Sequence, residues 1–238
     1  PRVATAGLVR GAYMFLRFPR GGKKVPDPEA QAEAYCKAVD LQAGKDFPPV
    51  LDVEFPGDGR KETGMTAGEC LLWVLRAYQV LRAHYDTRPI IYTSARVWRD
   101  DLDNMPAPEL LPCPLWLARY PFKAGPAMRD PRAFDGGRHD PPVPKPWGDP
   151  DNWWLHQCQG GATGFPGMSG QVDMNRFHTL VPGSPRSSRV DWVRGKLALA
   201  PGRFDTEAAA RLCDFQSRRG LVPDGIVGPR TFAALCWA

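Results

Sequence analysis

Short apolar runs alternate with helix-type segments from residue 7 to residue 177, and this alternation limits the folds open to the chain. The six runs have the β-branched and aromatic density of strands; they are GLVRGAYMFLRF (7–18), FPPVLDVEF (47–55), RPIIYTS (88–94), PLWLARY (114–120), WWLHQCQ (153–159) and QVDMNRF (171–177). Strands that alternate with helices favour a mainly parallel sheet or barrel, with its chemistry at the carboxyl ends of the strands. We therefore predict an α/β fold for this part of the chain.

Capping signals locate the helices between these strands. Asp27 stands directly before a proline, so it is the expected cap of a helix that runs to Gly44. Thr66 and Glu69 form a T-x-x-E capping box, which opens the next helix. A shorter helical piece is expected over residues 95–104.

The composition changes near the end of the last strand. The small-residue and proline-rich stretch VPGSPRSSR (181–189) precedes a segment with its own helices. We predict a barrel domain over residues 1–181, a linker over 182–189 and a small all-α domain over 190–238. Within the barrel, residues 121–152 are rich in proline and glycine, and we interpret them as a long ordered loop beside the barrel mouth.

The composition also excludes several classes of protein. With 43% hydrophobic residues the chain is not disordered throughout, and no apolar run approaches the roughly 18 residues that a membrane span needs. The net charge of +5 comes from scattered Lys and Arg without a dense basic patch, which argues against a nucleic-acid partner. The six cysteines contain no C-x-x-C pair and no zinc spacing, so we expect reduced structural thiols.

Two carboxylates interrupt one of the apolar strands. Asp52 and Glu54 lie two residues apart in VLDVEF, and this spacing points both side chains to the same face of a strand. Two acids that face inward repel each other and resist desolvation, so one tends to keep its proton and can act as a general acid. The alternative is that both acids flank a turn before Pro56 and only pair with Arg or Lys.

Aromatic side chains lie in or beside the predicted strands, where they either stack on sugar rings in a cleft or pack in the core. They are Tyr92, Trp116, Tyr120, Trp153 and Trp154. Asp173 and Asn175 share one face of the last strand. The four histidines form no H-E-x-x-H motif, and no G-x-S-x-G nucleophile elbow is present.

Five segments carry a resemblance to a known family: GAYMFLRF, PVLDVEF, PIIYTS, LWLARY and WWLHQCQGGATGFPGMSGQVDMNRF. Their order and approximate spacing over residues 7–180 resemble glycoside hydrolase family 25, the muramidases that include many phage endolysins. The later segment FDTEAAARLCDFQSRRGLVPDGIVGPRTFAALCW is similar to a peptidoglycan-binding domain of the small three-helix type. Its signature is FQ-x-x-x-GL-x-x-DGIVGP-x-T.

The resemblance implies an irregular (β/α) barrel of the family 25 lysozyme type, followed by a small all-α three-helix domain. It implies that Glu54 protonates the glycosidic oxygen of the β-1,4 bond between N-acetylmuramic acid and N-acetylglucosamine. Asp52 would be its electrostatic partner, steadying the substrate's own N-acetyl group as it attacks the anomeric carbon. Asp173 matches a catalytic position on the last strand, and the substrate-binding positions are Tyr92, Trp116, Tyr120, Gln157 and Asn175. The resemblance implies no metal and no cofactor.

Two departures from the family pattern bear on this reading. Family members begin with a strand that carries a further active-site Asp in a G-(I/V)-D-x-S context, followed by a second strand, and neither is found here. We therefore expect a barrel without its first strands, in a chain that is either a fragment of a longer product or a degenerate relative. Met14 stands where the family usually carries His in a Y-H-F triplet.

The leading hypothesis is a modular muramidase, either a phage endolysin or a bacterial autolysin, that its C-terminal domain holds on bacterial peptidoglycan. We expect a monomer that acts at the cell wall after secretion or after release during phage lysis, and no signal peptide is visible. One alternative is a non-catalytic wall-binding protein with a degenerate barrel. A weaker one is a related barrel that acts on chitin.

Overall fold

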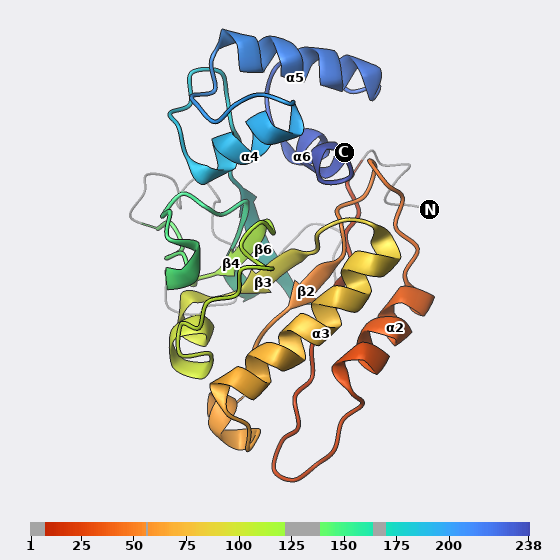
Figure 1. The fold of residues 1–238 in the computed structure, drawn as a ribbon, viewed down its shortest axis with the longest axis vertical. Coiled ribbons are helices and arrows are strands. Elements are labelled where there is room, and N and C mark those ends of the chain that lie inside the picture. The colour runs from red at the N-terminus through yellow and green to blue at the C-terminus, as the bar shows by residue number, and fades with distance from the viewer. Residues whose placement is uncertain (1–7, 56, 122–138, 164–169) are drawn as a thin grey trace.

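The structure is a computed structural model that describes residues 8–55, 57–121, 139–163 and 170–238 (Figure 1). Its centre is one six-stranded sheet in which each strand pairs with the next along the chain. The strands are β1 (Tyr13–Phe15), β2 (Val50–Asp52), β3 (Ile90–Thr93), β4 (Leu115–Ala118), β5 (Leu155–Ala162) and β6 (Val172–Phe177). Among the described residues, no helix has the length and apolar character needed to cross a membrane.

The sheet is mixed. Strands β1 to β5 are parallel, as the alternation of strands and helices predicts, whereas β6 is antiparallel to β5. The connection over residues 163–171 is too short for the crossover that a parallel strand requires. The result is a half-barrel with helices on its outer face, which confirms the predicted α/β class.

Two helices cover the outer face of the sheet, α2 (Pro28–Ala38) and α3 (Ala67–Tyr85). The capping box of α3 is confirmed, because Thr66 accepts a hydrogen bond from the backbone N–H of Glu69 and the Glu69 carboxylate accepts one from the backbone N–H of Thr66. Asp27 occupies the cap position of α2 without a side-chain hydrogen bond, and the fixed φ of the following proline opens the helix. The prediction that this helix reaches Gly44 is wrong, since the backbone is already extended at Val39.

Short helical turns follow the strands. The expected piece over residues 95–104 is a single π-helical turn, η2 (Val97–Asp101), and a 3₁₀ turn, η1 (Gly59–Glu62), follows β2. Much of the predicted ordered loop over residues 121–152 lies outside the described residues. Its described part contains one 3₁₀ turn, η4 (Lys145–Trp147).

Successive residues of β2 and β3 enter two different cores, as the two-residue period of a strand dictates. Leu51 and Ile91 belong to the outer core, which α2 and α3 cover. Val50 and Ile90 belong to an inner core, which the C-terminal helices cover. These helices are α4 (Ser188–Lys196), α5 (Thr206–Arg218) and α6 (Pro229–Cys236), so the predicted three-helix segment is present.

The C-terminal helices pack at the end of the sheet where the parallel strands begin. Phe232 of α6 lies 4.6 Å from Trp154, 5.5 Å from Phe177 and 5.9 Å from Phe47 between ring centroids. A backbone bridge between Leu180 and Val227 adds to this contact. The three helices therefore close the end of the half-barrel where the parallel strands begin, and they share its inner core.

Two sequence signals inside the C-terminal segment have structural explanations. Helix α4 begins at Ser188, inside the predicted linker, because the Ser187 side chain accepts a hydrogen bond from the backbone N–H of Val190 and caps the helix. The domain boundaries themselves stay a prediction. The buried Gln216 of the FQ signature donates to Asp224 Oδ1 (2.8 Å) and Thr231 Oγ1 (3.1 Å), so these signature residues hold the turn before α6.

All six cysteines are free, as expected for reduced structural thiols. Cys70, Cys113, Cys158 and Cys236 are buried.

Candidate active site

A pocket of about 200 Å³ opens at the carboxyl ends of the parallel strands. It is lined by Tyr13, Phe15, Asp52, Glu54, Tyr92, Trp116, Gln157, Asp173 and Asn175. Seven of the eight predicted site residues line this pocket, and the eighth, Tyr120, is hydrogen-bonded to Gln157. The structure therefore brings all eight side chains to one place, from strands that are far apart in the sequence.

The two carboxylates of VLDVEF lie at the end of β2. Asp52 is the last residue of the strand and pairs in register with Phe15 of β1 and Tyr92 of β3. Its side chain is buried, and its Oδ1 atom has no hydrogen-bond partner. Glu54 is half-buried and lines the pocket on the same side. Within the described residues neither acid forms an ion pair, which argues against the structural alternative of simple pairing with Arg or Lys.

Burial raises the pKa of both acids. The pKa of Asp52 rises to about 8, chiefly through desolvation and further through the charge of Glu54 and a hydrogen bond with it. Desolvation also raises the pKa of Glu54, against the lowering effect of its hydrogen bond with Asp52 and of the Arg96 charge. The nearby Asp173 raises it further. The pair therefore keeps a shared proton at neutral pH, as the sequence predicts for two inward-facing acids.

Gln157 organises the opposite wall of the pocket. Its Oε1 atom accepts hydrogen bonds from the hydroxyls of Tyr92 (2.5 Å) and Tyr120 (2.6 Å). Its Nε2 atom donates to Asp173 Oδ2 (2.8 Å), and the backbone N–H of Gly161 donates to Asp173 Oδ1 (3.0 Å). Both oxygens of Asp173 are thus held, so this carboxylate has a fixed position beside the acid pair.

Trp116 and Asn175 complete that wall. The indole Nε1 of Trp116 donates to Asn175 Oδ1 (2.8 Å), and its ring meets Tyr92 edge to face at 5.0 Å. Tyr120 is 54% exposed, so one face of its ring is open to solvent. This arrangement offers flat aromatic surfaces next to carboxylates, which suits the binding of sugar rings.

A bulge in β5 allows this geometry. The register between β5 and β6 shifts after Gln157 and again after Gln159. A Cβ atom on Gly160 would lie 3.4 Å from the Tyr120 hydroxyl oxygen, and Gly161 has a φ of +64°. Glycine at both positions lets the strand bend close to Tyr120 and Asp173.

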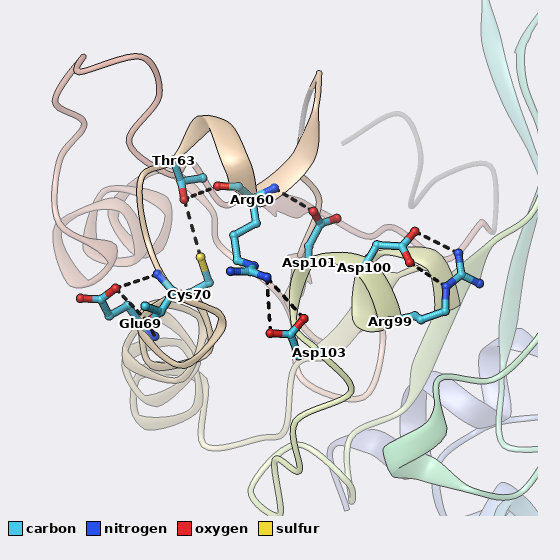
Figure 2. A network of polar contacts seen from close by, with 9 residues as sticks. Arg60, Thr63, Glu69, Cys70, Arg99, Asp100, Asp101 and Asp103 are labelled. Carbon is cyan, nitrogen blue, oxygen red and sulfur yellow. Dashed lines mark hydrogen bonds and ion pairs between the residues drawn. The ribbon is translucent and has the colours of Figure 1, made fainter.

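Polar contacts also join the turns that follow β2 and β3 (Figure 2). The backbone N–H of Arg60 in η1 donates to Asp101 Oδ1 in η2 (2.7 Å), and the Arg60 guanidinium donates to Asp103 (3.3 Å). A Cβ atom on Gly59 would lie 2.2 Å from Asp101 Oδ1, so only glycine permits this approach. Arg96, which acts electrostatically on Glu54, lies 3.6 Å from Asp101 Oδ2.

Some pocket residues are missed by the sequence analysis, and some aromatic candidates prove to be core. Tyr13 and Phe15 line the pocket and are 65% and 41% exposed, and no signal in their apolar run shows which of its faces turns toward the pocket. Met14 itself points into the outer core and not into the pocket. Trp153 and Trp154 are buried in the two cores.

The described residues contain no group of three or more His, Cys, Asp or Glu side chains placed to hold a metal ion.

Comparison with known sequences gives two matches to protein families. A model described as "Glycosyl hydrolases family 25" matches residues 2–137, more than half of the chain. A model of a peptidoglycan binding domain matches residues 193–235. No curated protein matches the chain.

Solved structures share the fold. A muramidase from Acremonium alcalophilum is 23% identical, with a TM-score of 0.53 over 74% of this chain and 71% of that one. A bacterial lysozyme from Streptomyces coelicolor is 23% identical, with a TM-score of 0.54 over 74% of this chain and 70% of that one. The spore cortex lytic enzyme SleM of Clostridium perfringens is 20% identical, with a TM-score of 0.51 over 78% of this chain and 57% of that one.

Proposed function

The chain belongs to family 25 of the glycosyl hydrolases and carries a peptidoglycan-binding domain, and from this premise we propose that it cleaves the β-1,4 bond between N-acetylmuramic acid and N-acetylglucosamine. The observation that carries the proposal is the buried acid pair at the pocket, whose raised pKa values retain a proton at neutral pH. Glycoside hydrolysis needs such a proton for the leaving oxygen.

Glu54 is the proposed general acid. It is the more exposed member of the pair and lines the pocket, so its carboxyl can reach a glycosidic oxygen, whereas Asp52 lines the same pocket with a nearly buried side chain. Two acids on neighbouring positions of one strand face leave no room for the water that an inverting pair holds across roughly 6.5–9.5 Å. This favours attack by the substrate's own N-acetyl group, with Asp52 steadying that group.

Asp173 is the proposed third carboxylate of the reaction. Its two oxygens are held by Gln157 and the backbone N–H of Gly161, and its charge raises the pKa of Glu54. It therefore helps to keep the general acid protonated until the leaving group takes the proton. Tyr92, Trp116, Tyr120, Gln157 and Asn175 are the proposed sugar-binding residues, and we add Tyr13 and Phe15.

Release of reducing ends from N-acetylated peptidoglycan by this chain tests the proposal. Glu54→Gln keeps the size and loses the transferable proton, so we expect at least a roughly 100-fold loss of rate with wall binding retained. Mass spectrometry should find products that end in reducing N-acetylmuramic acid. The exposed Glu33→Gln on α2 is the matched control and should keep full activity. Equal rates for Glu54→Gln and the unchanged chain would refute the assignment.

One observation favours a second candidate, binding of the wall without hydrolysis. On the β1 side of the pocket, the described residues contribute Tyr13 and Phe15 and no carboxylate. The same assay separates the candidates. A folded sample that binds sacculi but releases no reducing ends over a day is a binding protein.

We also propose a bacteriolytic role for the chain as a phage endolysin or bacterial autolysin that works at the cell wall as a monomer. The peptidoglycan-binding domain supports the location, because it places the half-barrel on its polymeric substrate. Clearing of a suspension of bacterial walls tests the lytic role, and light scattering from the purified chain tests the monomer.

A further inference from the structure

Side chains on the inner face of the half-barrel form a layer at the level of the acid pocket. Asp52 of β2 pairs in register with Tyr92 of β3, and Gln157 of β5 pairs with Asn175 of β6. All four residues line the pocket. Trp116 of β4 also lines it, pairs with Tyr92 and donates a hydrogen bond to Asn175 Oδ1. These five residues are the pocket layer.

A second layer lies on the same face, nearer the end of the sheet that the C-terminal helices close. Each of its residues is two positions from a residue of the pocket layer on the same strand, so both side chains share one face. Val50 pairs with Ile90, and Leu155 pairs with Phe177. The first three are buried in the inner core, and Phe177 packs against it. Because a strand rises about 3.3 Å per residue, this supporting layer is roughly 7 Å from the pocket layer.

Phe232 of α6 lies against the supporting layer and is fully buried. Its ring centre is 4.6 Å from that of Trp154, directly before β5, and 5.5 Å from that of Phe177 in β6. The backbone N–H of Trp154 donates to the backbone oxygen of Leu115 in β4 (2.8 Å). One side chain of the C-terminal domain thus supports β5 and β6 directly and β4 through Trp154.

Close packing transmits a displacement of Phe232 to the pocket layer. Protein interiors are packed as densely as organic crystals, so a buried side chain moves only if its neighbours move. The pair of Leu155 and Phe177 is two residues from the pair of Gln157 and Asn175 on the same two strands. The Gln157 amide is hydrogen-bonded to two tyrosine hydroxyls and one carboxylate of the site. A shift of β5 against β6 therefore disturbs several sugar-binding groups together.

We propose that Phe232 positions the pocket layer, so that the C-terminal domain is part of the catalytic unit as well as its anchor on the cell wall. The inference rests on the proposed function for the identity of the sugar. It goes beyond tethering, because a tether raises the local concentration of the polymer and leaves the pocket unchanged. Phe232 is a positioning residue, since it acts on the sugar through Trp154 and Phe177.

The test uses the full chain and a short, soluble, N-acetylated glycan of peptidoglycan without stem peptides, for which anchoring on the cell wall is irrelevant. Phe232→Leu removes the aromatic contacts and keeps an apolar side chain. Phe215→Leu is the matched control, because Phe215 is buried in α5, which lies further from the sheet than α4 and α6 (Figure 1). Thermal melting identifies a temperature at which both variants stay folded, and kcat and KM are measured there.

We expect Phe232→Leu to raise KM about fivefold and Phe215→Leu to change it by less than about twofold. Partial unfolding lowers the apparent kcat and leaves KM unchanged, so KM separates positioning from a loss of stability. An unchanged KM in Phe232→Leu, or an equal rise in both variants, overturns the proposal. Phe177→Leu alters the intermediate ring at a half-buried position and should also raise KM, so it decides the question if Phe232→Leu does not fold.

Failure of the proposed function gives a different result. An unchanged chain that releases no reducing ends from this glycan refutes the proposed hydrolysis. Titration calorimetry then compares the Kd of the same variants for the glycan, and Trp116→Ala identifies the part of the binding that occurs in the pocket. A pocket Kd that is equal in Phe232→Leu and the unchanged chain overturns the positioning role, and a Kd about fivefold weaker supports it.

Discussion

The Asp52 carboxyl is 5% exposed, and one of its oxygens lacks a hydrogen-bond partner. Its pKa rises from 3.8 to about 8 on folding, so at pH 7 the chain must take up a proton to fold. This lowers the free energy of unfolding as pH rises from about 4 to about 8. Asp52→Asn removes the free-energy cost of protonating this carboxyl on folding. We expect it to stabilise the fold at pH 7 by up to roughly 4 kcal/mol while activity is lost.

Urea unfolding at pH 7.5 and pH 4 measures this effect. The gain should be large at pH 7.5 and small at pH 4, where Asp52 is protonated in the folded chain and close to the midpoint of its titration in the unfolded chain. Asp214→Asn, at an exposed position of α5, is the control and should change neither value. A variant that is no more stable than the unchanged chain at pH 7.5 contradicts the raised pKa.

At the scale of residues, the sequence predicts the candidate catalytic carboxylates of the pocket better than it predicts the aromatic side chains that line it. The spacing of Asp52 and Glu54 on an apolar strand is a local pattern, so one sequence is enough to find it. The positions of Tyr13 and Phe15 depend on which face of β1 turns toward the pocket, and an apolar strand does not reveal that. The sequence also leaves the role of Trp154 open, because an aromatic residue at the end of a strand can either line a cleft or pack in a core.

At the scale of elements, two neutral histidines lie at the pair of strands β5 and β6: His156 in β5 is buried, and His178, directly after β6, is half-buried. Arginine only donates hydrogen bonds, so His156 Nδ1 accepts from Arg176 (3.0 Å) and His178 Nε2 accepts from Arg189 (2.9 Å). Burial, with a smaller effect of the arginine charges, lowers the pKa of each ring from 6.5 to about 4. Their contribution to stability is complete above about pH 6.5 and is lost as pH falls toward 4, at roughly 3 kcal/mol for each ring.

We therefore expect the urea midpoint to fall between pH 7 and pH 4.5. The measurement belongs in the Asp52→Asn background, because Asp52 changes stability with pH in the opposite direction. His156→Gln should reduce the pH dependence by the equivalent of one proton, whereas His84→Gln, at an exposed position of α3, should leave it unchanged. If both variants keep the full pH dependence, the buried rings are not its source.

The elements themselves are predictable where a local signal fixes them. The capping box of α3 and the six apolar runs correspond to observed elements because caps and burial patterns act within a few residues. The end of α2 at Ala38 has no such signal, since neither glycine nor proline follows it directly. The β5 bulge has only Gly160 and Gly161 as a local signal, which permits a bulge without fixing its register.

At the scale of the whole molecule, the sequence separates two modules that the structure joins. A linker rich in small residues and proline predicts a tethered domain, yet Phe232, Val190 and Leu212 share one buried cluster with Val50 and Ile90. The strands β2 and β3 are buried on both faces. Their apolar sequences predict that other segments pack on each face, but they do not show which segments these are. The inner cover comes from the C-terminal helices, the first of which begins at Ser188, far beyond the end of β3 at Thr93.

A shared core makes the half-barrel dependent on the C-terminal helices for its stability. A chain that ends at residue 181 would leave Val50, Ile90 and Leu155 open to water, so we expect it to bind a hydrophobic dye and to lack a cooperative melting transition. The full chain should melt in one transition by calorimetry. Phe232→Ala in the full chain should lower the free energy of unfolding by about 3–5 kcal/mol, because the ring contacts aromatic residues of the barrel. A truncated barrel that melts cooperatively at the temperature of the full chain would show instead that the two parts fold independently and that the contact between them adds no stability.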